Sequence, residues 1–160
     1  MYSLPRTWVK AAPLRGASFL VAATCVKNLY PEVFERLSRG RVALITCPED
    51  DNSTQVMGKL ASMARCSKPR EIVAVSIEGS PHCLLIHAAV NEALFVLGEK
   101  IPTKHYVVLN GELIEIEPEA VRVARYLHLV DGLVKEKPEI LEKLRKYSLE
   151  YRWASSSGST

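Results

Sequence analysis

The side chains best suited to chemistry in this sequence are three cysteines and one histidine that follow apolar segments. Cys25 and Cys47 come directly after two such segments, and Cys83 follows a third with His82 immediately before it. Thiolate and imidazole groups are the usual protein ligands of zinc, and thiolates hold iron–sulfur clusters. The residue types therefore predict a zinc or iron–sulfur site with Cys25, Cys47, Cys83 and His82 as ligands.

The elements that would position these residues alternate between buried strands and helices. Apolar runs predict strands over 18–24, 41–46 and 71–77, and the segments after them predict helices over 28–40, 56–66 and 83–100. Asn52 or Ser53 can cap the second helix, while Ser80 and Pro81 open the third. This alternation is typical of parallel strands that are joined by right-handed crossovers.

A different pattern follows these crossover units. Residues 105–116 contain two short β-runs around an Asn-Gly pair at 110–111, which predicts an antiparallel hairpin at one edge of the sheet. Pro118 then opens a helix that Pro138 breaks, and residues 140–149 form a last helix. We expect these C-terminal helices to pack across one face of the sheet.

Together these segments predict a three-layer α/β/α fold. The sheet is expected to be mainly parallel, with four to five strands and the antiparallel hairpin at its edge. We interpret residues 1–16 as an irregular N-terminal arm, 17–152 as a single α/β domain and 153–160 as a disordered tail.

The predicted fold brings the three cysteines to one place. In an open parallel sheet all strands end at the same edge, and ligands bind at that carboxyl edge. Cys25, Cys47 and Cys83 lie at the ends of successive strands, and neighbouring strands are about 4.8 Å apart, so their sulfur atoms can share one ion or cluster. Cys66 lies at the far end of its helix, so we expect it at the opposite edge.

A metal-free interpretation uses the same segment. With Ser80 as the cap and Pro81 in first position, Cys83 falls in the opening turn of a helix, where free N–H groups and the helix dipole favour a thiolate. Cys83 would then be a nucleophile or redox centre, and His82 would serve as its base. The same N–H groups, together with Ser80, can instead hold a phosphate or carboxylate.

Plain structural roles compete with these site assignments. Cys25 can simply fill the core, and His87 can be a buried histidine whose hydrogen bonds are satisfied. His105 has no suitable neighbour in the sequence. In the acidic loop 49–51, Asp50 is a candidate general acid or base, but a solvated acidic pair that starts a helix explains the same residues.

Composition excludes several classes of function. The net charge of +3 comes from 21 basic and 18 acidic residues that are mixed along the chain, so no basic stripe for nucleic acid is present. No apolar stretch has the length of a membrane span, and Arg15 and Gly16 interrupt the one run that resembles a secretion leader. The scattered cysteines favour a cytoplasmic protein with reduced thiols, whose partner is a small molecule or a redox protein.

The C-terminal helices allow a third interpretation. The run LHLVDGLV at 127–134 can form an apolar helical face, which would suit a non-catalytic subunit that assembles into a homo-oligomer. The Lys- and Glu-rich helices also fit a heat-adapted source.

Two resemblances add to these expectations. A cysteine after an early strand, a nearby aspartate and the His82-Cys83 pair resemble the zinc edge of β-class carbonic anhydrases, although that family separates its histidine and second cysteine by two residues. The segments TCPEDDN at 46–52, GSPHCLLIH at 79–87 and VRVARYLHLVDGL at 121–133 are similar to a group of small uncharacterised archaeal α/β proteins. Some of those proteins carry iron–sulfur or ferredoxin-like labels, so this resemblance implies a cluster at the cysteine edge.

Overall fold

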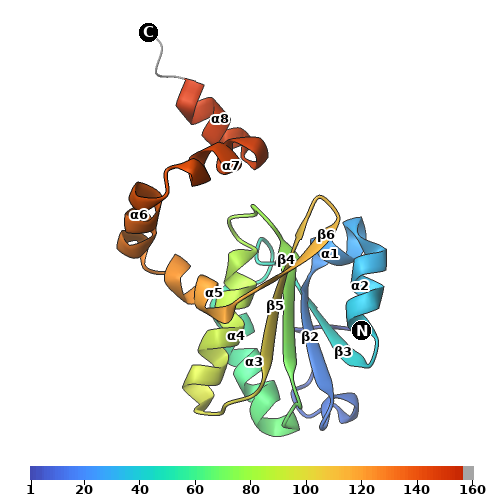
Figure 1. Ribbon diagram of the computed structural model, residues 1–160. Helices are drawn as coiled ribbons and strands as arrows, with labels where there is room; N and C mark the ends of the chain where they lie inside the picture. Colours follow the sequence, from blue (N-terminus) through green and yellow to red (C-terminus); the bar gives the residue numbers. More distant parts are fainter. Residues whose placement is uncertain (157–160) are drawn as a thin grey trace. The chain divides into compact units, whose positions relative to one another are not determined.

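The computed structural model, which describes residues 1–156, contains a six-stranded sheet (Figure 1). Its strands are β1 (Tyr2–Ser3), β2 (Ser18–Ala23), β3 (Arg41–Thr46), β4 (Ile72–Ile77), β5 (Thr103–Leu109) and β6 (Glu112–Ile116). They follow the order β1-β3-β2-β4-β5-β6, in which every neighbouring pair is parallel except β5 and β6. The mainly parallel sheet with an antiparallel edge pair confirms the predicted fold class.

Helices cover both faces of this sheet. They are α1 (Thr24–Leu29), α2 (Pro31–Ser38), α3 (Ser53–Ser67) and α4 (Leu84–Leu97). The crossover from β2 to β3 and the crossover from β3 to β4 run in opposite directions along the sheet. Because both are right-handed by the general rule, α1 and α2 lie on one face and α3 and α4 lie side by side on the other (Figure 1).

The central strands are buried on both faces, which is why their sequences are continuous apolar runs. In β2 the residues from Phe19 to Ala23 are all buried, and in β4 so are those from Ile72 to Ser76. Leu60 and Met63 from α3 and Val90 from α4 are completely buried in the same core. A core of this kind fixes the strand ends, and therefore the side chains just beyond them.

The N-terminal segment differs from the irregular arm that the sequence predicts. Its strand β1 pairs with the edge strand β3, and Leu4 N donates to Ile45 O at 2.8 Å. Leu4 and Leu14 are completely buried in the core. A strand of two residues is too short to show a period-two pattern, so the sixth strand could not be recognised from the sequence.

Local signals in the sequence are confirmed at two positions. Asn52 is the cap of α3, since its Oδ1 accepts hydrogen bonds from the N–H groups of Thr54 and Gln55. The turn between β5 and β6 has positive φ at both Asn110 (50°) and Gly111 (90°), as a two-residue hairpin turn of type I′ requires.

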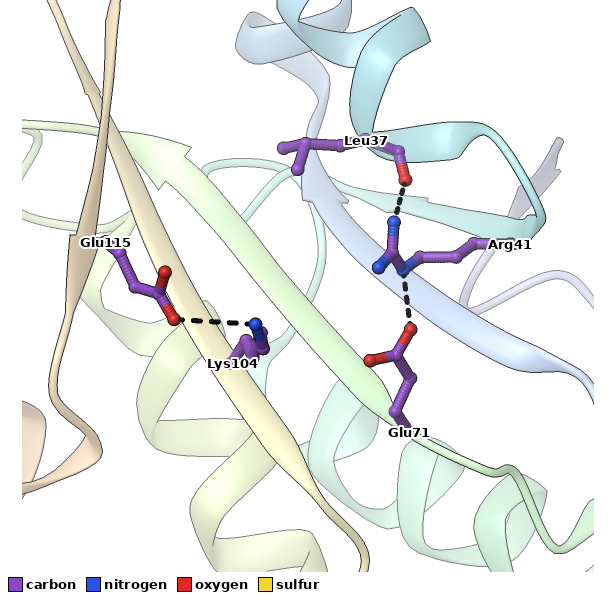
Figure 2. A network of polar contacts seen from close by, with 5 residues as sticks. All are labelled: Leu37, Arg41, Glu71, Lys104 and Glu115. Carbon is purple, nitrogen blue, oxygen red and sulfur yellow. Dashed lines mark hydrogen bonds and ion pairs between the residues drawn. The ribbon is translucent and has the colours of Figure 1, made fainter.

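Ion pairs stabilise the amino edge of the sheet (Figure 2). Arg41, at the start of β3, contacts Glu71, just before β4, with 2.9 Å between Nε and Oε1. The same guanidinium donates from Nη1 to the carbonyl of Leu37 at 2.9 Å. Lys104 and Glu115 form a longer and more exposed pair across β5 and β6, at 3.9 Å. Because β2 lies between β3 and β4, the Arg41 contacts fasten three neighbouring strands.

The chain after residue 121 forms a compact unit of its own, Arg122–Thr160, whereas the sequence suggests one domain over 17–152. A helix α5 (Pro118–Ala124) is followed by α6 (Leu127–Glu136), α7 (Glu139–Tyr147) and α8 (Leu149–Ser156). No residue of α6, α7 or α8 is buried, which explains why this part separates from the first unit. The expectation that these helices cover the sheet stays a prediction.

Two further features of this region differ from expectation. The helix that the sequence predicts from Pro118 to Pro138 is interrupted at Tyr126, whose φ of -115° and ψ of 81° are not helical. Of the predicted tail, Trp153 to Ser156 belong to α8, and 157–160 lie outside the described residues. Within the described chain, no helix is both long and apolar enough to cross a membrane.

Candidate functional site

Three cysteines come to the carboxyl edge of the sheet, as the sequence predicts. Cys25 lies in the first turn of α1 directly after β2, Cys47 follows β3, and Cys83 directly precedes α4 in the connection from β4. Since β2 lies between β3 and β4, the three residues follow neighbouring strands. Cys66 lies near the end of α3, at the opposite edge. All four are free thiols.

The electrostatics of Cys25 show that this group is close together. Partial burial raises the pKa of the Cys25 thiol, and negative charge on Cys83, Cys47 and Glu49 raises it further. None of these neighbours lies in the segment that carries Cys25: Cys47 and Glu49 follow β3, and Cys83 follows β4. The edge therefore gathers three thiols and a carboxylate, and negative charge on the other three groups disfavours the thiolate of Cys25.

The loops that carry these residues are joined by one polar contact. His82 Nδ1, in the connection between β4 and α4, lies 2.6 Å from Glu49 Oε1, in the connection between β3 and α3. Both side chains are exposed to solvent, His82 by 50% and Glu49 by 63%. This contact spans the end of β2, where Cys25 lies.

The arrangement is not a formed coordination sphere. Within residues 1–156, no three His, Cys, Asp or Glu side chains are arranged to hold a metal ion. Cys83 is buried, Cys47 is partly buried and Cys25 is exposed. The thiols are therefore neighbours that differ in exposure, and they would have to turn toward a common point to bind a metal.

The acidic loop positions Cys47 through Asp51 rather than Asp50. Asp51 Oδ2 accepts hydrogen bonds from the hydroxyl of Thr46 at 2.7 Å and from the N–H of Cys47 at 3.0 Å. Asp50 is exposed. Both aspartates line a polar hollow of about 310 Å³, to which Arg6 also contributes.

The start of α4 differs in detail from the prediction. Regular helix begins at Leu84, so Cys83 is the cap position and not part of the first turn. Ser80 Oγ accepts a hydrogen bond from the N–H of Cys83 at 3.4 Å. Residues 81–83 form a turn before the helix. Ser80 therefore forms part of the turn before α4. Its hydroxyl already accepts from the N–H of Cys83, one of the groups predicted from the sequence to hold a ligand.

A second cluster of polar groups was not assigned to a site from the sequence. Ser76 Oγ of β4 lies 2.8 Å from His87 Nε2 of α4, and His87 Nδ1 lies 3.0 Å from His105 Nδ1 of β5. All three side chains are buried. The one available signal was Ser76, a polar residue near the end of an otherwise apolar strand. The prediction that His87 is a satisfied core histidine agrees with these hydrogen bonds.

The order of the strands defines the class of protein. The chain moves from β2 outward to β3 and then crosses β2 to reach β4, so the direction of winding reverses between β2 and β4. In doubly wound α/β proteins, ligands bind at the carboxyl edge where this reversal occurs. The chain is thus an open, doubly wound α/β protein with thiols at its switch point.

Comparison with known proteins agrees with this class. A family model described as Rossmann-like domain matches residues 11–159, and the chain belongs to this family. The match supports the expected small α/β protein but shows no iron–sulfur or ferredoxin-like character. Searches of curated proteins and of solved structures found nothing that matches the chain.

Proposed function

We propose that this Rossmann-like protein binds a thiophilic metal at its switch point, either zinc or the iron of a cluster. The proposed ligands are Cys25, Cys47, Cys83 and His82. The observation that carries this proposal is the position of three thiols at the ends of neighbouring strands, where negative charge on Cys83, Cys47 and Glu49 repels the Cys25 thiolate. A bound cation removes that repulsion, because it stabilises the thiolates and releases their protons. Free thiols of this kind also suit a reducing, cytoplasmic environment.

The Glu49 contact supports His82 as a ligand. Histidines that bind metals usually give one ring nitrogen to a carboxylate and the other to the metal. Glu49 contacts Nδ1, which leaves Nε2 of His82 for coordination. An exposed pair of this kind contributes only about 0 to 1 kcal/mol, so the ring can move toward a metal at little cost.

Rotation of the exposed side chains would have to close the site. Cys83 is buried and forms the fixed part, whereas Cys25 and Cys47 are more accessible and their side chains can turn. Tetrahedral coordination by three sulfurs and one nitrogen is a common zinc arrangement. For a cluster, the same three thiols would provide most of the ligands.

Titration of the purified full chain with Co²⁺ under anaerobic conditions tests this proposal. Co²⁺ replaces zinc in thiolate sites and gives intense sulfur-to-metal absorption, whose strength reports the number of thiolates. We expect one equivalent to saturate the absorption, and elemental analysis to find zinc or iron in protein prepared without chelator. Replacement of Cys25, Cys47 or Cys83 by serine should each weaken the absorption, whereas C66S, the matched control, should not. Equal absorption in all four variants, or none in the wild type, would refute the proposal.

Metal-free thiol chemistry by Cys83 is less favoured by the geometry. Cys83 is only 7% exposed, which limits the approach of a substrate to its sulfur. Asp50, the candidate proton-handling residue, is exposed to solvent. If the wild type binds no metal and Cys83 nevertheless reacts fastest with iodoacetamide, the thiol mechanism replaces the metal site.

One observation favours a second function, assembly into a homo-oligomer. The C-terminal unit carries many exposed large apolar side chains, namely Leu127, Leu129, Leu133, Ile140, Leu144, Tyr147, Leu149 and Trp153. Exposed large apolar side chains that gather into a patch mark interaction sites. We propose that two copies of the chain associate through these helices. Light scattering should then give a dimer mass for the wild type and a monomer mass for L133D or L144D, with K143D as the control; a monomeric wild type would exclude it.

A further inference from the structure

A second cavity in the first unit has features of a binding site that is distinct from the cysteines. It has a volume of about 430 Å³ and lies between the ends of β4 and β5, the start of α4 and the start of α5. Typical small-molecule pockets measure roughly 300 to 1,000 Å³. The volume therefore suits a compact ligand.

The cavity has a buried floor and an exposed rim. Ser76, His87 and Val107 line it and are each at most 7% exposed, while Pro81 and Ala120 line it and are exposed. Apart from the polar pair on the floor and a few groups of the β4–α4 loop, its walls are aliphatic. A ligand can therefore enter this cavity from solvent and make a polar contact with the buried Ser76 and His87 pair on its floor.

The polar contact on the floor is backed by a chain of hydrogen bonds. Ser76 is paired with His87, and the other nitrogen of His87 is paired with His105, at the distances given above. If His87 donates to His105, its Nε2 accepts the Ser76 proton, and the hydroxyl oxygen can then accept from a ligand. If His105 donates to His87, Nε2 donates to Ser76, and the hydroxyl can then donate to a ligand. Ser76 can therefore either accept a hydrogen bond from a ligand or donate one to it.

The charge around the cavity restricts the ligand. Burial, and then the proximity of His105, lower the pKa of His87 to about 4, so the floor is uncharged at neutral pH. Among residues 1–156, Glu78 is the one charged residue that lines the cavity, and no lysine or arginine does. An anion entering this cavity would lose its hydration without gaining a counter-ion, which is costly.

We propose that this cavity binds a small, uncharged, mainly apolar molecule whose carbonyl, amide or hydroxyl group is held by Ser76. The proposal is independent of the metal site, because no cysteine lines the cavity. Covalent catalysis by Ser76 is not part of it. A histidine with a pKa near 4 is a weak base at neutral pH, and a general base works best when its pKa lies near the working pH.

Three probes of similar size test the proposal on the full chain by heteronuclear NMR. Benzamide carries a neutral polar group, benzoate carries an anionic one and toluene carries none. We expect benzamide to shift the amide signals of the cavity residues with a dissociation constant on the order of 1 mM, and to bind at least about tenfold more tightly than benzoate. S76A should weaken benzamide binding about five- to tenfold and leave the binding of toluene unchanged.

A substitution at the rim of the cavity distinguishes loss of ligand binding from loss of folding. Ala120 is exposed, so A120W should leave the fold intact while it fills the mouth and abolishes the shifts caused by benzamide. Gln55 is exposed on α3 and does not line the cavity, so Q55W should bind benzamide as the wild type does. Equal affinity for benzoate and benzamide, unchanged binding in A120W, or no localised shifts up to the solubility limit of benzamide would each overturn the proposal.

Discussion

His87 and His105 face each other through their Nδ1 atoms, 3.0 Å apart, inside the core of the first unit. Two neutral imidazoles at this distance need one Nδ1 to donate and the other to accept, so the pair is satisfied by a single proton between them. A further proton on His87 would place a positive charge in the buried interior, beside a second imidazole. Burial therefore favours the neutral form of His87.

This relationship predicts that the protein loses stability in mild acid. The pKa of His87 is about 4 in the folded protein and 6.5 for an ordinary histidine, so the unfolded chain takes up a proton first as the pH falls. The stabilisation is complete above pH 6.5 and is lost between pH 6.5 and 4. We expect His87 to account for a decrease of about 3 kcal/mol in the free energy of unfolding over this interval.

Urea denaturation at several pH values measures this effect. H87Q should be less stable than the wild type at neutral pH, by about 1 to 3 kcal/mol, and should lose stability less steeply as the pH falls. Carboxylates contribute to acid denaturation in both proteins, so the difference between the two slopes isolates His87. Parallel slopes would contradict the prediction.

The thiol cluster predicts that Cys83 contributes to the raised pKa of Cys25. In C83S the negative charge that Cys83 contributes is absent, so the pKa of Cys25 should fall, yet it should stay above its ordinary value because partial burial is the larger cause. The pH profile of alkylation at Cys25, followed by mass spectrometry, reports this pKa. C66S serves as the control and should leave the profile unchanged. A Cys25 profile that is identical in C83S would show that the two sulfur atoms do not interact.

Glu49 is expected to matter for metal binding far more than for stability. Its contact with His82 is exposed, so E49Q should change the free energy of unfolding by less than about 1 kcal/mol. If Glu49 orients His82 as a ligand, E49Q should weaken Co²⁺ binding by about tenfold or more. E32Q, on the exposed surface of α2, is the matched control. Unchanged Co²⁺ affinity in E49Q would remove His82 and Glu49 from the proposed site.

The two ion pairs at the amino edge of the sheet are expected to contribute differently to the free energy of unfolding. Arg41 contacts Glu71 and also donates to the carbonyl of Leu37, whereas Lys104 makes a single exposed contact at 3.9 Å (Figure 2). We expect R41A to lower the free energy of unfolding by about 1 to 2 kcal/mol and K104A to change it by less than about 0.5 kcal/mol. R41K should fall between the wild type and R41A, since lysine cannot reproduce the fork of the guanidinium. Equal losses in R41A and K104A would show that the Leu37 contact contributes nothing.

Much of the fold follows from local signals in the sequence. The runs at 18–24, 41–46 and 71–77 are apolar throughout because parallel strands are covered on both faces, and such runs are recognisable without knowing their neighbours. The Asn-Gly pair specifies its turn through backbone sterics alone. The two-residue strand β1 has no such signal, since its place in the sheet depends on β3 and on the burial of Leu4.

The two candidate sites likewise combine features that the sequence determines with features that depend on the tertiary structure. The sequence by itself determined that Cys25, Cys47 and Cys83 follow successive strands, and the parallel direction of those strands then requires them to lie at one edge. Only the tertiary structure decided which strand lies between which, that His82 contacts Glu49, and that Ser76, His87 and His105 form one chain. Those contacts join separate elements, and their geometry depends on how the helices pack on the sheet. Periodicity along a chain records which face of an element is buried, but it carries no information about which residue of another element lies opposite.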